Sequence, residues 1–154
     1  MERERLAVNE GVNGTLQLCR HTLQMGGVKV ETALAEGLPP VLGNGNQLRQ
    51  VLLNLMLNAG QAMERSAVRR LTVSTAGTAG AGVELRVADT GPGIAPEVKD
   101  LLFRPFITTK RRGQGTGLGL SVSRSIVEAH GGTIRAENTP GQGATFVVSL
   151  PPAA

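Results

Sequence analysis

The spacing of apolar residues along the chain predicts both helices and strands. Helical spacing extends over residues 8–25, over a segment that begins at Asn44 or Asn46 and runs through Met63, and over residues 118–132. Short apolar runs predict strands at 28–34, 70–75 and 83–89 and at "TIRAEN" and "ATFVVSL", and leave room for a short strand at Val41-Leu42. This order predicts a two-layer α/β sandwich, with one mixed sheet and helices on one face.

Composition argues against several classes of function. Hydrophobic residues make up 40% of the chain and aromatic residues 2%, so aliphatic packing has to form the core. The net charge is +4, but the basic residues are scattered and few aromatic rings could stack on bases, which argues against a nucleic-acid partner. Cys19 is the only cysteine, so neither a disulfide framework nor a cysteine-based zinc site is expected. No apolar run approaches the ~20 residues of a membrane span. We therefore expect a soluble, cytoplasmic chain without direct membrane contact.

Side-chain amides line one face of the helix that runs through Met63. At about 100° per residue they fall within an arc of roughly 80°; they are Gln47, Gln50, Asn54, Asn58 and Gln61. Asn is a poor helix former, and most exposed helix faces use Glu and Lys instead. Amide oxygens suit a Mg²⁺ ion that keeps several waters and binds phosphate oxygens. The helix alone fits an ordinary polar face and a metal–phosphate site about equally well.

Two glycine-rich segments predict a nucleotide site. In "DTGPGI" (89–94), Asp89 falls on the inward face of its strand, where a carboxylate can accept the exocyclic amine of adenine. In "GQGTGLGLS" (113–121), alternating glycines precede a helix, and such a helix N-terminus can bind an anion. Neither the P-loop nor the Rossmann pattern occurs, so a nucleotide would bind by another route. Between these segments, "FRPFITTK" (103–110) offers Thr108, Thr109 and Lys110 to phosphate.

Taken together, these segments resemble the ATP-binding catalytic domain of sensor histidine kinases. The resemblance covers nearly the whole chain and rests on the order of "NLMLNA", "DTGPGI", "FRPFITTK", "GTGLGL" and "GQGATF". It implies an α+β fold of the Bergerat type, shared with type II topoisomerases, heat-shock chaperones and mismatch-repair ATPases. That fold has a mostly antiparallel sheet, about three helices on one face, and a long mobile ATP lid at residues 95–116 that orders over nucleotide. Residues 9–152 would be this domain, and residues 1–8 a linker or the remnant of a preceding helix.

The resemblance also implies roles for individual residues. Asn58 would bind Mg²⁺, Asn54 would lie beside it at the phosphates, and Lys110 would approach the terminal phosphates; these three would be the catalytic residues. Asp89 would accept the adenine amine, with Thr145 near that contact. The remaining ATP-binding residues would shape the base pocket (Gly91, Gly93, Ile94) or contact the phosphates (Thr109, Gly115, Thr116, Gly117, Leu118, Gly119, Leu120).

The implied activity is transfer of the γ-phosphate of ATP to a histidine in two-component signalling. Hydrolytic members of the fold class have a Glu where this chain has Asn54, and an amide is a negligible general base, which favours a kinase over an ATPase. The acceptor would lie on a partner domain, with a response regulator downstream, because His21 and His130 both fit structural positions. A hydrolytic ATPase and a nucleotide-responsive interaction module without catalysis remain the alternatives, and the parent kinase could be membrane-anchored.

Overall fold

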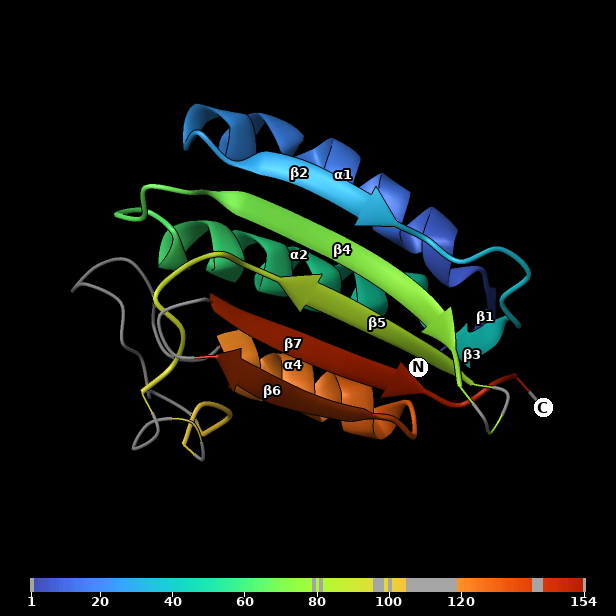
Figure 1. The fold of residues 1–154 in the computed structure, drawn as a ribbon. Helices are drawn as coiled ribbons and strands as arrows, with labels where there is room; N and C mark the ends of the chain where they lie inside the picture. Colours follow the sequence, from blue (N-terminus) through green and yellow to red (C-terminus); the bar gives the residue numbers. More distant parts are fainter. Residues whose placement is uncertain are drawn as a thin grey trace.

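Among the residues that the structure describes, three helices cover one face of a five-stranded sheet (Figure 1). The computed structural model describes residues 2–78, 80, 82–95, 99, 101–104, 119–139 and 143–153. The helices are α1 (Val8–Met25), α2 (Gly45–Ala62) and α4 (Gly119–Ala129). The strands run in the order β2 (Lys29–Ala33), β4 (Arg70–Gly77), β5 (Val83–Ala88), β7 (Gly143–Leu150) and β6 (Thr133–Thr139). The pair β2–β4 is parallel and the other pairs are antiparallel, so the predicted mixed, mostly antiparallel α/β sandwich is confirmed.

The start of the chain, for which a linker or the remnant of a preceding helix is expected, contains a short strand. Residues Glu4–Leu6 form β1, which pairs antiparallel with β3 (Val41–Gly43) in a separate two-stranded sheet. A single charged turn cannot offset the cost of helix nucleation, whereas the edge of β3 offers ready hydrogen-bond partners. The Arg3 guanidinium also donates to the carbonyl of Ala129, over 2.6 Å. The start of the chain therefore packs on the domain.

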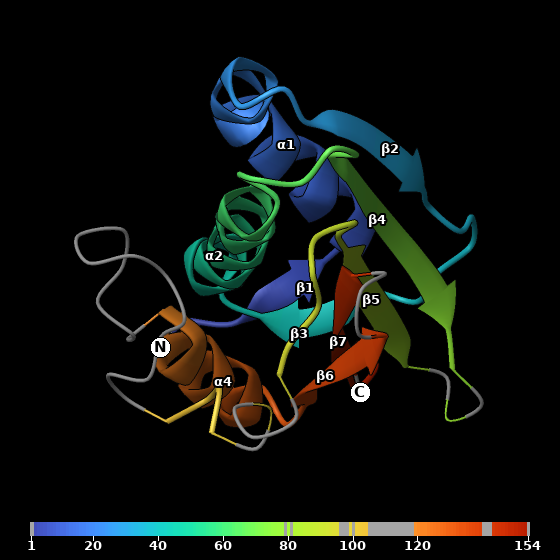
Figure 2. The same ribbon diagram turned by 60° about the vertical axis from the view of Figure 1, so that its left-hand side comes forward.

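Aliphatic side chains fill the space between the helices and the inner face of the sheet. Helical spacing on α1 and α2 and alternation on β5 bring these side chains inward, as the sequence predicts. The buried set includes Val12, Leu16, Cys19 and Leu23 of α1, Val51, Leu52, Leu55, Met56 and Ala59 of α2, and Val83, Leu85 and Val87 of β5. Figure 2 shows α2 lying between α1 and α4, and α2 packs against both. No helix among the described residues combines the length and apolar character that a membrane span requires.

The beginning of α2 is joined to the end of α4. Asn44 is the N-cap of α2, and its side-chain oxygen accepts from the backbone N–H of Gln47 at 3.0 Å. The buried His130 at the end of α4 accepts from the backbone N–H of Asn44 through Nε2 and contacts the carbonyl of Ile126 through Nδ1. A Cβ at Gly43 would lie 2.6 Å from the His130 ring, so this junction requires glycine. His130 is therefore structural, as the sequence predicts.

Candidate functional site

One ridge of α2 links the end of β5 to the start of α4. Asn54, Asn58 and Ala62 are four residues apart and lie above one another on this ridge. The side chain of Asn54 reaches α4, and the carbonyl of Ala62 lies against Gly91, where an added Cβ would be 2.9 Å from it. Asn54 and Ala62 are separated by about 12 Å along the helix axis. The half-buried Asn58 lies between them, so the structure brings the two asparagines and the turn after β5 together along one strip.

Contacts with α4 set the orientation of the Asn54 amide. Its Nδ2 donates to the carbonyl of Gly119 and to the hydroxyl of Ser123, each over 3.4 Å. Because a carbonyl oxygen can only accept, the nitrogen must be the atom that faces α4. Ser123 is fully buried. The amide oxygen of Asn54 is consequently turned away from α4. Sequence reasoning missed Ser123, although a serine among the apolar positions of α4 was a usable signal.

Asp89 continues the inward face of β5 and is buried, with 7% of its surface exposed. One carboxylate oxygen, Oδ1, accepts from the backbone N–H of Gly91 at 2.9 Å and from that of Ala144 at 3.3 Å. Burial raises the pKa of this carboxyl above its ordinary value, and the two backbone N–H groups oppose that rise. Among the described residues, no ion pair involves Asp89. The carboxylate is therefore oriented by the backbone rather than by a cation.

Glycines allow the chain to turn tightly beside Asp89. The backbone N–H of Gly91 donates to Oδ1, and Gly93 adopts a positive φ of 82°. Gly143 of β7 also has a positive φ, and an added Cβ there would overlap the carbonyl of Asp89. After the turn, both backbone polar groups of Ile94 bond to the Asn138 side chain of β6. Gly143 and Asn138 were missed by sequence reasoning, although an asparagine within a strand pattern is itself unusual.

The structure does not place Thr145 beside the Asp89 carboxylate. Thr145 pairs with Ala88, and its side chain therefore points to the outer face of the sheet, away from the helices. Ala144 is the residue that faces Asp89: its carbonyl accepts from the backbone N–H of Asp89, and its own backbone N–H donates to the Asp89 carboxylate. The predicted position of Thr145 is thus wrong by one residue, which in a strand exchanges one face for the other.

The other predicted site residues lie at the start of α4 or outside the described part of the chain. Gly119 is the exposed first residue of α4, and the partly buried Leu120 packs against the core. Seven predicted residues and most of the predicted lid lie outside the described residues; the seven are Thr108, Thr109, Lys110, Gly115, Thr116, Gly117 and Leu118. Within the described residues, no group of three or more His, Cys, Asp and Glu side chains could hold a metal ion.

A cavity of about 440 Å³ lies at the N-terminal ends of α1 and α2, next to β1. Apolar side chains such as Leu48 and Val148 form part of its wall, and Glu10 and Arg49 also line it. None of the predicted site residues lines this cavity. The candidate site is therefore the strip between Asp89, the α2 ridge and the start of α4.

The family model of the histidine kinase-, DNA gyrase B- and HSP90-like ATPases matches residues 43–154. The chain belongs to this family. Sensor histidine kinase ZraS of Escherichia coli strain K12 is 41% identical to it over 144 residues, which make up 94% of this chain and 30% of ZraS. The chain thus spans less than a third of the length of this relative.

Solved structures of histidine kinases in this family have the same fold. The catalytic domain of ThkA, in a nucleotide-free form, matches with a TM-score of 0.87 and 31% identity, over 99% of this chain and 97% of that domain. Full-length ShkA in complex with AMPPNP matches with a TM-score of 0.86 and 28% identity, over 98% of this chain and 31% of ShkA. ThkA in complex with the response regulator protein TrrA matches with a TM-score of 0.81 and 27% identity, over 97% of this chain and 41% of the matched chain. The chain therefore has the Bergerat fold of histidine kinase ATPase domains.

Proposed function

We propose that this chain binds ATP with Mg²⁺ and transfers the γ-phosphate to a histidine on a partner phosphoacceptor domain. The observation that carries the proposal is the buried Asp89 carboxylate, which two backbone N–H groups hold at one end of the α2 ridge. Asn54 and Asn58 lie on the same ridge toward α4. A base-recognition group and phosphate-facing amides thus line a single strip.

The base end of the strip has the chemistry that adenine requires. Oδ1 of Asp89 is occupied by backbone donors, so Oδ2 can accept the exocyclic amine of the purine. Guanine has a carbonyl at that position, which an ionised carboxylate repels. Gly91 and Gly93 let the backbone approach a flat base closely, and Ile94 offers an apolar contact. The complex of the related ShkA with AMPPNP supports an adenine nucleotide as the ligand.

The phosphate end of the strip fits Mg²⁺ and the triphosphate. The amide oxygen of Asn58 is a neutral, hard donor, and such a donor suits an ion that keeps several waters and shares phosphate oxygens. Bound there, Mg²⁺ would neutralise charge on the phosphates. Asn54, whose amide nitrogen is held by α4, turns its oxygen away from that helix. Lys110 and the glycine-rich segment before α4 are proposed to complete this end.

The residue at position 54 favours transfer to histidine over hydrolysis. An amide cannot take a proton from water at neutral pH, so water at this site is poorly activated. A neutral imidazole already attacks without such help. The bond from phosphorus to the β,γ-bridging oxygen breaks as the bond to the imidazole nitrogen forms, and ADP leaves. In-line positioning and charge neutralisation are then the main tasks of the domain. A response regulator is the proposed downstream partner, and the ThkA–TrrA complex supports it.

The test is calorimetric titration of a non-hydrolysable ATP analogue with and without Mg²⁺, followed by a transfer assay with a phosphoacceptor domain. We expect binding that Mg²⁺ strengthens, and radiolabel from γ-labelled ATP on the histidine of the acceptor. Steady phosphate release by the chain alone, on the order of 1 s⁻¹ or faster, would instead identify a hydrolytic ATPase. Binding without either reaction would identify a nucleotide-responsive interaction module.

A further inference from the structure

We propose that Asn138 is a positioning residue for the base end of this site, because its side chain holds the backbone of Ile94 in place. The inference rests on the proposed function and adds a residue that sets affinity for the adenine nucleotide. Asn138 belongs to β6, the edge strand of the sheet beside β7, and is separated from Ile94 by 44 positions in the sequence.

The Asn138 carboxamide satisfies both backbone groups of Ile94. Its Oδ1 accepts from the Ile94 N–H at 2.6 Å, and its Nδ2 donates to the Ile94 carbonyl at 2.5 Å. Each partner can play one role only, so the amide orientation is fixed by chemistry. The Asn138 carboxamide bonds to the Ile94 backbone as the backbone of a neighbouring strand would, because it offers one acceptor and one donor side by side.

Asn138 also lies in the same cross-strand row as Asp89. Asn138 of β6 is paired with Ala144 of β7, whose backbone N–H bonds to the Asp89 carboxylate. All three side chains are on the inner face, because Ala136, two residues before Asn138, is buried there. The chain therefore leaves the sheet at Asp89, turns at Gly93, where φ is 82°, and returns to the same row at Ile94. The segment that shapes the base pocket is anchored at both ends.

Loss of this anchor affects binding more than folding. The surroundings of Asn138 and Ile94 are only partly buried, so water can replace the lost bonds in the free protein. The segment from Gly91 to Ile94 would then gain freedom that nucleotide binding has to remove. Ordering the backbone of one or two residues corresponds to roughly a tenfold or greater loss of affinity.

The test uses calorimetry with ADP and with a non-hydrolysable ATP analogue on the whole chain. Two variants, Asn138→Ala and Asn138→Asp, are compared with Asn13→Ala on the exposed face of α1. We expect both Asn138 variants to bind both nucleotides roughly tenfold more weakly, with the Mg²⁺-dependent gain in affinity unchanged and with Asn13→Ala like wild type. Asn138→Asp is isosteric but turns an acceptor toward the Ile94 carbonyl, so its loss should be at least as large as that of Asn138→Ala.

A kinetic measurement separates positioning from general destabilisation. In the transfer assay at a temperature where all variants are folded, the KM for ATP should rise for the Asn138 variants while kcat stays within about twofold. Exchange of the Ile94 amide proton should be faster in Asn138→Ala. Wild-type affinity in Asn138→Asp, or a fall in kcat without a rise in KM, overturns the role assigned to Asn138. If wild type itself fails to bind either nucleotide, the proposed function fails and the inference fails with it. Should Asn138→Ala not fold, the isosteric variant alone decides between these outcomes.

Discussion

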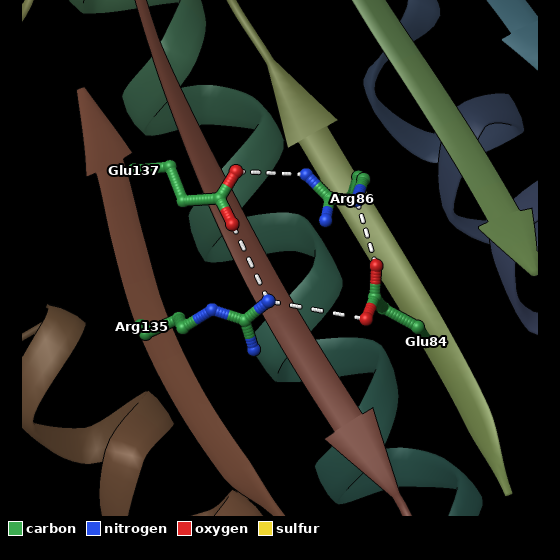
Figure 3. Close-up of polar contacts among 4 residues, drawn as sticks. All are labelled: Glu84, Arg86, Arg135 and Glu137. Carbon is green, nitrogen blue, oxygen red and sulfur yellow. Dashed lines mark hydrogen bonds and ion pairs between the residues drawn. The ribbon is translucent and has the colours of Figure 1, made fainter. Parts of the chain in front are cut away.

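Charged side chains on the two faces of the sheet differ in their pairing and burial. On the outer face, Glu84, Arg86, Arg135 and Glu137 form a ring of alternating charges that joins β5 to β6 across β7 (Figure 3). On the inner face, Asp89 is a buried carboxylate that accepts, among the described residues, from two backbone N–H groups. The outer charges are paired and at least partly exposed to water, whereas the inner charge is buried and forms no ion pair with another described residue. Charge contributes to packing on the outer face, and on the inner face we propose that it recognises the nucleotide.

The outer ring covers an apolar side chain. Arg86 bonds to Glu84 at 2.7 Å and to Glu137 at 2.8 Å, and Arg135 completes the ring at 3.3 and 3.9 Å. Val147 lies in register between the two arginines and is fully buried, although it is on the outer face. The arginine stems shield it from water. The bond to Arg86 lowers the pKa of Glu137, so this carboxylate favours the folded state when ionised.

Asp89 has the opposite relation to stability. Burial raises the pKa of its carboxyl, so the charged form is less favourable in the folded chain than in the unfolded chain. A carboxylate whose charged form destabilises the folded state is a candidate functional residue, because such groups concentrate at functional sites.

Removing the charge of Asp89 should weaken nucleotide binding while it raises the stability of the fold. In Asp89→Asn, Oδ1 can still accept from Gly91, but a donor replaces the acceptor that faces the adenine amine. We expect affinity for the ATP analogue to fall on the order of 100-fold, while the melting temperature rises. Titration calorimetry and thermal unfolding measure the two effects, with Glu137→Gln on the outer face as a control that leaves binding unchanged. Unchanged affinity in Asp89→Asn would remove the assigned base contact.

The dependence of stability on pH should reveal the same group. Because the folded pKa of Asp89 is raised, the folded chain binds its proton more tightly, and the destabilising contribution of Asp89 grows as pH rises through that pKa. The difference in unfolding free energy between Asp89→Asn and wild type should therefore be largest above this pKa and vanish below the unfolded pKa. Denaturant titrations across the acid range measure it. A difference that grows on acidification would contradict the sign.

Asn58→Ala should remove the gain in affinity that Mg²⁺ provides. One interaction with a charged group is lost, which corresponds to roughly a tenfold or greater change. Titrations with and without the ion should then give the same affinity in the variant and different affinities in wild type. If Mg²⁺ strengthens binding equally in both proteins, Asn58 does not bind the ion.

Ser123→Ala should have a smaller effect on the same end of the site. The buried hydroxyl holds Nδ2 of Asn54, and its loss leaves only the bond to Gly119. We expect an affinity loss of about threefold to tenfold, measured with the ATP analogue. Ser125→Ala, on the exposed side of the same helix, is the matched control. Equal binding by the two variants would show that Asn54 needs no support from Ser123.

Breaking the outer ring should matter least. Arg86→Gln removes bonds to Glu84 and Glu137, but these pairs are partly or largely exposed, so the expected loss of stability is below about 1 kcal/mol. That loss should shrink in high salt, and nucleotide affinity should not change. Denaturant unfolding at two salt concentrations, beside calorimetry, checks both statements. A change in affinity would mean that the two faces of the sheet are coupled.

The spacing of apolar residues was sufficient to predict most helices and strands and the inward orientation of the Asp89 side chain. The helical spacing of apolar residues predicted α1 with its observed bounds, and strict alternation along β5 predicted that Asp89 faces inward. Both patterns are properties of a few consecutive residues. The short strand β1 was missed because a three-residue run contains too few positions to show a period. Thr145 was misplaced because an error of one residue along a strand reverses the face.

The sequence by itself determined where most helices and strands form, which of their faces are apolar, and that asparagines and one carboxylate would lie on inward or ridge positions. Only the tertiary structure decided which distant groups meet: Asn54 with Ser123, and Asn138 with Ile94. The physical reason is the separation along the sequence of the residues that determine each feature. Periodicity arises from the backbone geometry of adjacent residues, whereas contacts across dozens of positions depend on strand order, register and helix packing, which no local pattern encodes.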